Sequence, residues 1–190
     1  MNIDQNPEPL GCELESILCG AAEKARVDVA PSVSPPILRS ISKGEKVTIR
    51  ACNGTRTIAH SGDVFEWHID PGFKELNKAG AKTPPAETEV YEMVRNATFT
   101  EIFGSLSANL DRLVLTQDQV VALVKEYRYL LRDERIATFF LLKDGDQFFV
   151  AEVHDLGEAG LGVHLLAFEY DGVCLADRRM RVVVPQLKQL

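Results

Sequence analysis

The stretch that decides the fold is IATFFLLKDGDQFFVAEVH, residues 136–154. Two runs rich in β-branched and aromatic residues flank Asp144-Gly145, a dipeptide typical of a tight type I′ turn. The sequence therefore predicts an antiparallel hairpin of residues 136–143 and 147–154. Both of its faces are apolar: one carries Phe140, Leu142, Phe149 and Ala151, and the other carries Phe139, Leu141, Phe148 and Val150. A sheet that is apolar on both faces must be covered on both.

A second hairpin is predicted over residues 163–184, with Asp171-Gly172 at its turn. The two hairpins together predict a four-stranded antiparallel sheet at the C-terminal end. Pairing outward from Asp171-Gly172 places His164 opposite Arg179 and close to Asp177. An Asp–His pair of this kind can orient a general base, although an ordinary polar network is the simpler interpretation.

Helices are predicted between residues 87 and 132, upstream of this sheet. Thr88 is a candidate N-cap for a helix with Val90, Tyr91 and Val94 on its inner face. Apolar residues at helical spacing predict a second helix (Phe99, Ile102, Phe103 and Leu106). Residues 116–119 have the form of a capping box, which indicates the start of a third helix that continues to residue 132.

A small β-meander is predicted before the helices. Residues 46–52 and 55–60 flank Asn53-Gly54, and residues 64–69 are the third strand. In this pairing His60 lies opposite Val47 and is a partly buried structural residue. The predicted fold class is α+β: an N-terminal helical arm, a small β-meander, a helical middle, and a C-terminal four-stranded antiparallel sheet packed on helices. The helical middle covers one sheet face; the meander, the arm or a second subunit covers the other.

The N-terminal residues are predicted to form an arm. Residues 13–29 show helical spacing of apolar residues, and the prolines of residues 31–36 stop the helix. The predicted boundaries are therefore 1–36 for the arm and linker and 37–190 for a single domain. Residues 1–30 are acidic and residues 31–56 are basic, so either the two segments dock on each other or both are solvated.

The composition excludes several classes of protein. The 190 residues are 45% hydrophobic and 26% charged, which suits one globular domain rather than a disordered chain. No apolar run is long enough for a membrane helix, and the acidic first thirty residues do not resemble a secretory signal. A net charge of −7 disfavours nucleic acid as a partner. We therefore expect a soluble cytoplasmic protein with no nucleic-acid or membrane partner.

The four cysteines do not predict a metal site or a disulfide framework. They are Cys12, Cys19, Cys52 and Cys174. None forms a C-x-x-C pair or has zinc-finger spacing to a histidine, so buried and inert thiols are expected.

Several strings along the chain resemble a family of uncharacterised bacterial proteins. They are Val90-Tyr-Glu-Met-Val94, Phe103-Gly-Ser-Leu106, Leu115-Thr-Gln117 with Gln119, Thr138-Phe-Phe140, Val182-Val-Val-Pro-Gln186 and Ile69-Asp-Pro-Gly-Phe-Lys74. The resemblance covers about residues 46–190. It implies a shared fold and a bacterial source, and it implies no activity, because the family has no established function.

The sharpest chemical motif is His68-Ile-Asp70. Alternation along a strand places both side chains on one face. With His154 or His164 as the third ligand, the set has the form of the 2-His-1-carboxylate triad that holds iron(II) in oxygenases. It is similar to the metal site of iron- and 2-oxoglutarate-dependent oxygenases, in which an arginine such as Arg178, Arg179 or Arg181 would clamp a carboxylate. Those enzymes use a jelly roll, whereas helices are predicted here between the ligands.

Two functions follow from these observations. The first is a non-catalytic binding or assembly protein, without a cofactor, whose two-faced sheet and charged arm engage a protein partner or a second copy. The second is a mononuclear iron(II)-dependent enzyme that uses His68, Asp70 and His154, with His164 as the alternative third ligand. No phosphate-binding loop, nucleophile elbow or zinc-protease motif is present in the sequence, so catalytic residues are not assigned.

Overall fold

The computed structural model describes residues 35–42, 47–131 and 136–187. These residues form one mixed sheet of eight strands in the order β1-β4-β8-β5-β6-β7-β3, with β2 paired beside β1 on β4. The strands are β1 (Leu38–Ser40), β2 (Val47–Ile49), β3 (His68–Ile69), β4 (Ala86–Met93), β5 (Thr138–Asp144), β6 (Gln147–Asp155), β7 (Leu161–Ala167) and β8 (Arg181–Pro185). The pairs β5–β8 and β3–β7 are parallel, and the others are antiparallel.

The hairpin of β5 and β6 confirms the central prediction. Asp144 pairs with Gln147, so the turn residues are Gly145 and Asp146 rather than Asp144-Gly145. Gly145 has a φ of 59°, the left-handed conformation that glycine supplies at the first position of such a turn. The displaced turn shifts the register by two residues, and an even shift leaves every side chain on its predicted face.

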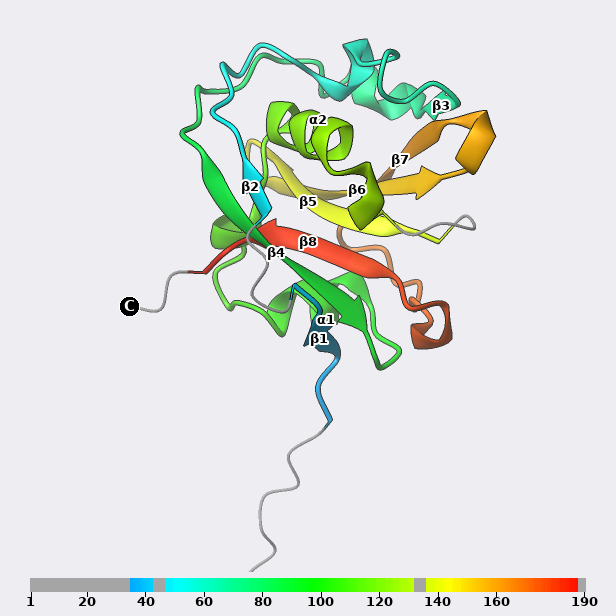
Figure 1. Ribbon diagram of the computed structural model, residues 1–190. Coiled ribbons are helices and arrows are strands. Elements are labelled where there is room, and N and C mark those ends of the chain that lie inside the picture. The colour runs from blue at the N-terminus through cyan, green and yellow to red at the C-terminus, as the bar shows by residue number, and fades with distance from the viewer. Residues whose placement is uncertain (1–34, 43–46, 132–135, 188–190) are drawn as a thin grey trace, which may run out of the picture. The chain divides into compact units, whose positions relative to one another are not determined.

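Two hydrophobic cores cover the two faces of the hairpin. Phe140 lies in the first core with α2 (Gln117–Glu126), and Phe139 lies in the second core with α1 (Phe99–Gly104). Figure 1 shows the two helices on opposite sides of the sheet. Both covers therefore come from the described part of this chain.

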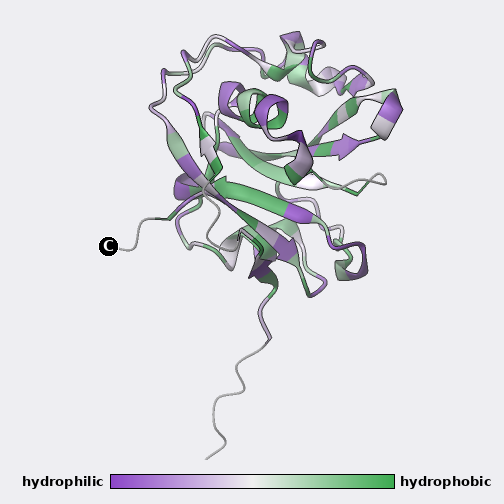
Figure 2. Cartoon of the chain, viewed as in Figure 1, coloured by the Kyte–Doolittle hydropathy of each residue, from purple (hydrophilic) through white to green (hydrophobic). Residues whose placement is uncertain are grey.

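The predicted fold class is wrong. The sheet has eight strands of mixed direction rather than four antiparallel ones, and the described residues contain two α-helices. The predicted hairpin over residues 163–184 does not form: β7 pairs with β6 and β3, and β8 inserts between β4 and β5. The run Val182–Val184 is buried and hydrophobic in Figure 2. Such a run favours an interior strand with both faces covered.

The predicted helix at Thr88 is also wrong, because residues 86–93 form β4. Thr88, Val90 and Glu92 are buried and alternate with more exposed residues. Val90, Tyr91 and Val94 fit helical spacing as well as strand alternation, so this short apolar pattern does not distinguish a helix from a strand. The segment is a strand because it pairs with β1 and β2 on one side and with β8 on the other.

The two remaining helix predictions are confirmed in position. Thr98 caps α1 and Thr116 caps α2, each through a complete capping box. The helix α2 ends at Glu126 rather than at residue 132. It is followed by a 3₁₀ turn at Arg128–Leu130 (η4).

The predicted β-meander does not form. β2 pairs with β4, residues Ile58–His60 form a 3₁₀ turn (η1), and β3 is a two-residue strand at the far edge of the sheet. His60 is exposed rather than partly buried opposite Val47. Gly54 has a φ of 79° and donates its N–H to the buried Asp118 carboxylate at 2.8 Å.

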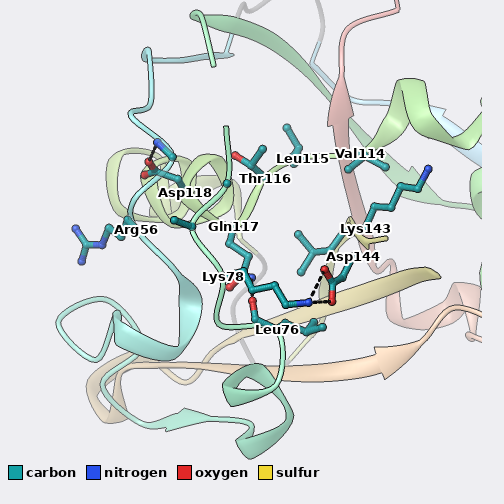
Figure 3. A pocket seen from close by; sticks show the side chains of 14 residues that line it. Arg56, Leu76, Lys78, Val114, Leu115, Thr116, Gln117, Asp118, Lys143 and Asp144 are labelled. Atoms are coloured by element: carbon teal, nitrogen blue, oxygen red, sulfur yellow. Dashed lines mark hydrogen bonds and ion pairs between the residues drawn. The ribbon is translucent and has the colours of Figure 1, made fainter. Parts of the chain in front are cut away.

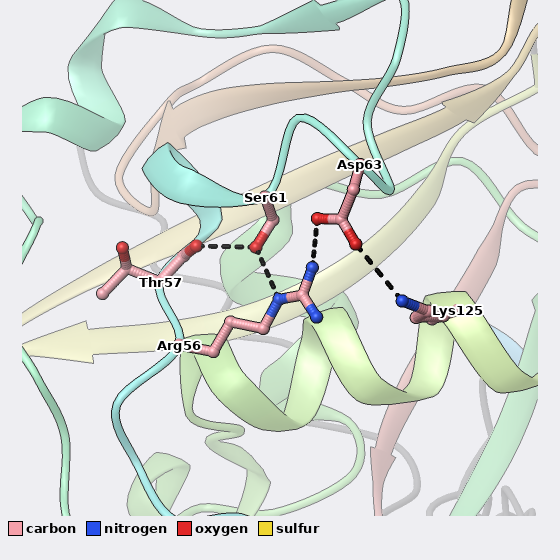
Figure 4. Close-up of polar contacts among 5 residues, drawn as sticks. All are labelled: Arg56, Thr57, Ser61, Asp63 and Lys125. Atoms are coloured by element: carbon pink, nitrogen blue, oxygen red, sulfur yellow. Dashed lines mark hydrogen bonds and ion pairs between the residues drawn. The ribbon is translucent and has the colours of Figure 1, made fainter.

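A polar network holds the segment after Gly54 on α2 (Figure 4). The Arg56 guanidinium contacts the Asp63 carboxylate and donates to Ser61 at 3.1 Å, and Lys125 donates to Asp63 at 3.2 Å. These hydrogen bonds hold the pKa of Asp63 below its usual value, Arg56 having the larger effect. The network fixes the start of the segment that leads to β3.

The chain divides into two units, residues 1–34 and 35–190. The predicted helix of residues 13–29, Cys12 and Cys19 lie outside the described residues. Within the described ranges no helix is long and apolar enough to cross a membrane.

Candidate functional site: a histidine cluster at the sheet edge

Three histidines meet on one face of the sheet where β6, β7 and β3 run side by side. Gly162 of β7 pairs with His154 of β6 on one side and with His68 of β3 on the other. His164 follows Gly162 by two residues, so its side chain lies on the same face. Val153 and Val163, which directly precede His154 and His164 in their strands, belong to the first core. Because neighbouring residues of a strand point to opposite faces, the histidines lie on the other face of the sheet.

The imidazole rings lie close together. The ring centres of His68 and His164 are 4.9 Å apart, and those of His154 and His164 are 5.6 Å apart. The three side chains come from sequence positions separated by up to 96 residues, and the sheet register alone brings them together. His164 is the ring that neighbours both of the others.

Trp67 forms one wall of this histidine cluster. Its indole lies 5.5 Å from the His68 ring and 6.3 Å from the His164 ring, centre to centre. A Cβ at Gly162 would lie 2.3 Å from the indole, so glycine is needed for the ring to approach β7. Trp67 is nevertheless 50% exposed, so part of this wall faces solvent.

Two carboxylates border the cluster. Asp70 caps the 3₁₀ turn Pro71–Lys74 (η2) by accepting the Gly72 N–H at 2.8 Å, and its other oxygen lies 4.0 Å from His164 Nδ1. That same oxygen accepts the Leu165 N–H at 3.4 Å. Glu152 Oε2 lies 3.5 Å from His154 Nε2. Each carboxylate is thus positioned beside a different histidine.

The structure brings together all four residues proposed as alternatives for the metal site: His68, Asp70, His154 and His164. Whether they bind a metal stays a prediction. As the side chains stand, no three His, Cys, Asp or Glu residues within the described ranges are arranged to hold one ion. The rings are neighbours that do not yet converge on a common point.

The other predicted site contacts are not found. Because β7 does not pair with the residues before β8, the predicted facing of His164 with Arg179 and Asp177 is lost. Arg181 donates to the main-chain carbonyls of Leu130 and Leu131, so its guanidinium contacts the chain itself. Nothing among these contacts places an arginine as the predicted carboxylate clamp.

Three residues of the cluster were missed by sequence reasoning. They are Trp67, Glu152 and Gly162. Glu152 and His154 are two residues apart on β6 and therefore share a face, as His68 and Asp70 do. Gly162 and His164 share a face of β7 in the same way. These spacings were visible in the sequence, but the pairing of β7 with β3, which brings them together, was not.

A cavity beside the start of α2 offers a weaker site. It encloses about 250 Å³ between the start of α2, residues 76–80 and the β5–β6 turn (Figure 3). Its polar side chains already contact one another or their neighbours: Lys78 pairs with Asp144, Lys143 with Asp111, and Gln117 bonds to two main-chain groups. A ligand here would have to break these contacts, so the cavity is better explained as packing between surface loops.

The described cysteines do not contribute a reactive thiol. Burial raises the pKa of Cys52, and the nearby Asp118 carboxylate raises it further. Burial, together with the charge of Glu152, raises the pKa of Cys174 to about 11. Both thiols are therefore protonated at neutral pH.

Comparison of the chain with protein-family models, with curated proteins and with solved structures finds no match in any of the three. The resemblance to uncharacterised bacterial proteins stays a prediction, and any function has to be argued from the histidine cluster itself.

Proposed function

We propose that this protein binds one divalent transition-metal ion through His68, His154 and His164. The observation that carries the proposal is the meeting of three imidazoles from three strands, with ring centres 4.9 and 5.6 Å apart. Imidazole nitrogen suits zinc, iron, nickel and copper ions. The proposal concerns binding of the ion and assigns no reaction.

The ring separations fit a shared ion. A metal–nitrogen bond is about 2.0–2.1 Å long and the ring centre lies about 1 Å beyond the nitrogen, so two imidazoles at the tetrahedral angle have centres about 5 Å apart. Both observed separations are close to this value. The strands therefore hold His164 at this spacing from His68 and from His154.

The rings must turn before they can converge on the ion. Each imidazole rotates about two side-chain bonds, and a departure from the preferred rotamer costs about 1 kcal/mol. The His154 and His164 side chains keep 18% and 35% of their surface exposed, so neither is locked in a closed core. Metal–histidine bonds are strong enough to offset this cost.

The carboxylates support the histidines rather than the ion in this proposal. Metal-bound histidines commonly donate their second ring N–H to a carboxylate, which fixes the tautomer and raises the basicity of the ligand. Asp70 lies beside Nδ1 of His164, which leaves Nε2 of that ring for the metal. Both Asp70 oxygens already accept main-chain N–H groups. We therefore propose three histidine ligands in place of the predicted triad with Asp70.

Calorimetric titration with Zn²⁺ and Co²⁺ tests the proposal. We expect one ion per chain, and His164→Ala should weaken binding at least about 100-fold because it removes the central ring. His60→Ala is the matched control, since His60 is exposed in η1 and outside the cluster; it should bind like the native chain. Absence of saturable binding, or equal losses in both variants, would contradict the proposal.

Assembly with a second copy is the second candidate function. Three of the exposed large hydrophobic residues lie within six positions: Tyr170, Val173 and Leu175. An exposed apolar patch of this kind is typical of an interaction surface. Sedimentation velocity over a wide concentration range tests it. Self-association that Val173→Lys removes without lowering the thermal midpoint would support assembly, and a monomer at every concentration would exclude it.

A further inference from the structure

We infer that Asn53 is a site of spontaneous deamidation, at which the Gly54 nitrogen displaces the side-chain amide as ammonia. The product is a five-membered ring that water opens to aspartate or isoaspartate. The inference is independent of the proposed metal site. It is carried by the contacts that the fold places on the two reacting groups, the Asn53 carboxamide and the Gly54 N–H.

The sequence and the exposure of Asn53 allow the attack. The reacting atoms are Cγ of an asparagine and the main-chain nitrogen of the next residue, and a side chain on that residue crowds their approach. Of the asparagines in the chain, only Asn53 precedes a glycine, which has no side chain. Asn53 is exposed and lines a surface cavity of about 310 Å³ with Arg50 and Arg56, so water reaches the amide.

Two donors polarise the Asn53 carboxamide. The Thr55 N–H donates to Asn53 Oδ1 at 2.9 Å, and the Thr55 hydroxyl donates to the same oxygen at 2.7 Å. Attack on Cγ places negative charge on this oxygen, and donors that already point at it stabilise that charge. The bond from the Thr55 N–H also closes a ring that contains both Cγ and the Gly54 nitrogen, which keeps the two reacting atoms near each other.

A carboxylate accepts the proton that the attacking nitrogen must lose. The Gly54 N–H donates to Asp118 Oδ2 at 2.8 Å, and Asp118 is buried. An ionised acceptor strengthens this hydrogen bond, and a carboxylate in this position acts as the general base for the attack. Asp118 lies in the first turn of α2, far along the chain from Gly54, so the fold rather than the local sequence supplies this group.

The bonds and protons of the step balance. The Gly54 nitrogen forms a bond to Asn53 Cγ, and the bond between Cγ and Nδ2 breaks. The Gly54 proton passes to Asp118, the leaving nitrogen takes one proton from water, and the Asp118 proton neutralises the hydroxide that remains. The net change is the loss of one ammonia, after which one water opens the ring at either of its carbonyl groups.

Mass spectrometry of the folded full-length chain, incubated at neutral pH, tests the inference. Trypsin isolates Asn53 in the peptide of residues 51–56, and deamidation raises the mass of this peptide by the difference between a carboxyl and a carboxamide group. We expect Asn53 to react at least about tenfold faster than Asn109. Asn109 is the internal control, because it is exposed and accepts the Asp111 N–H in the same way but precedes Leu110.

Two substitutions separate the contribution of the fold from that of the Asn-Gly dipeptide. Asp118→Asn keeps an acceptor for the Gly54 N–H but removes the base, and should slow deamidation about tenfold. Thr55→Val removes one of the two donors to Oδ1 at an exposed position, and should slow it about threefold because the main-chain donor remains. In concentrated urea both variants should react at the native rate, because unfolding removes these contacts.

The outcomes decide each part of the inference. An unmodified Asn53, or a rate no higher than that of Asn109, would overturn it. If both folded variants deamidate at the native rate, the dipeptide alone sets the reactivity and the role of the fold is overturned. Slowing in the folded variants that disappears in urea would support it. Thr55→Val keeps this comparison available if Asp118→Asn does not fold, since Thr55 lies at the surface.

Discussion

Replacing Gly54 with alanine should destabilise the protein by about 3 kcal/mol or more. The new Cβ would lie 2.4 Å from the Gly80 carbonyl oxygen and 2.6 Å from that of Ala81. These are main-chain atoms, so they cannot move aside as a flexible side chain would. The φ of 79° at Gly54 adds a second penalty, because L-residues with a side chain rarely adopt it.

The same substitution would also disturb two hydrogen bonds. The Gly54 N–H donates to the buried Asp118 carboxylate, and the Gly54 carbonyl accepts the Gly80 N–H, both at 2.8 Å. Any shift of the chain that relieves the collision lengthens these bonds. Leaving a buried carboxylate without its donor costs about 1–3 kcal/mol or more.

Two other glycines separate the causes in urea unfolding experiments. Gly62 has open space where its Cβ would be and an ordinary φ, so Gly62→Ala should change the free energy of unfolding by less than about 0.5 kcal/mol. Gly145 also has open space but a φ of 59°, so Gly145→Ala should cost about 1–2 kcal/mol through backbone strain alone. If Gly54→Ala lowers the free energy of unfolding no more than Gly145→Ala does, the main chain of residues 80–81 moves aside without an energetic penalty, which would contradict the prediction.

Gly54 also shows why the N-terminal half was harder to predict than the C-terminal hairpin. Asn53-Gly54 and the 144–146 turn carry the same local signal, and both glycines have positive φ. At Gly145 the flanking runs are long and apolar, so the strands pair with each other. At Gly54 the flanking segments are short and polar, and they pair with residues far along the chain, Thr83 and Gly80. The turn dipeptide predicts only the local backbone conformation, whereas tertiary packing decides which segments pair with each other.

The same distinction explains the outcome for the candidate site. Alternation placed His68 and Asp70 on one face from the sequence alone, because both lie on or beside one strand. The choice between His154 and His164 stayed open because it depends on how β3 pairs. A two-residue parallel strand at a sheet edge has no sequence signature of its own. In the structure His154 and His164 both lie in the cluster, so the two alternative third ligands are neighbours.

The two faces of the β5–β6 hairpin give the last prediction. Phe139→Ala and Phe140→Ala should each lower the free energy of unfolding by about 3–5 kcal/mol. Phe139 is 1% exposed and packs edge-on against Phe99 of α1, with ring centres 5.1 Å apart; Phe140 is 0% exposed and lies in the core beneath α2. Both cavities would open inside closed cores, and neither is easily filled by neighbouring side chains.

The comparison of these two variants decides what covers the second face. The sequence left that cover open between the meander, the N-terminal arm and a second subunit, whereas the structure assigns it to α1 and its neighbours within the described residues. The two losses of unfolding free energy in urea should therefore be similar and should not depend on protein concentration. Phe148→Ala, at a half-buried position in the same hairpin, should cost clearly less and serves as the control. If Phe139→Ala lowers the free energy of unfolding as little as this control does, α1 does not seal the second face. The cover of that face would then have to be the N-terminal arm or a second copy of the chain.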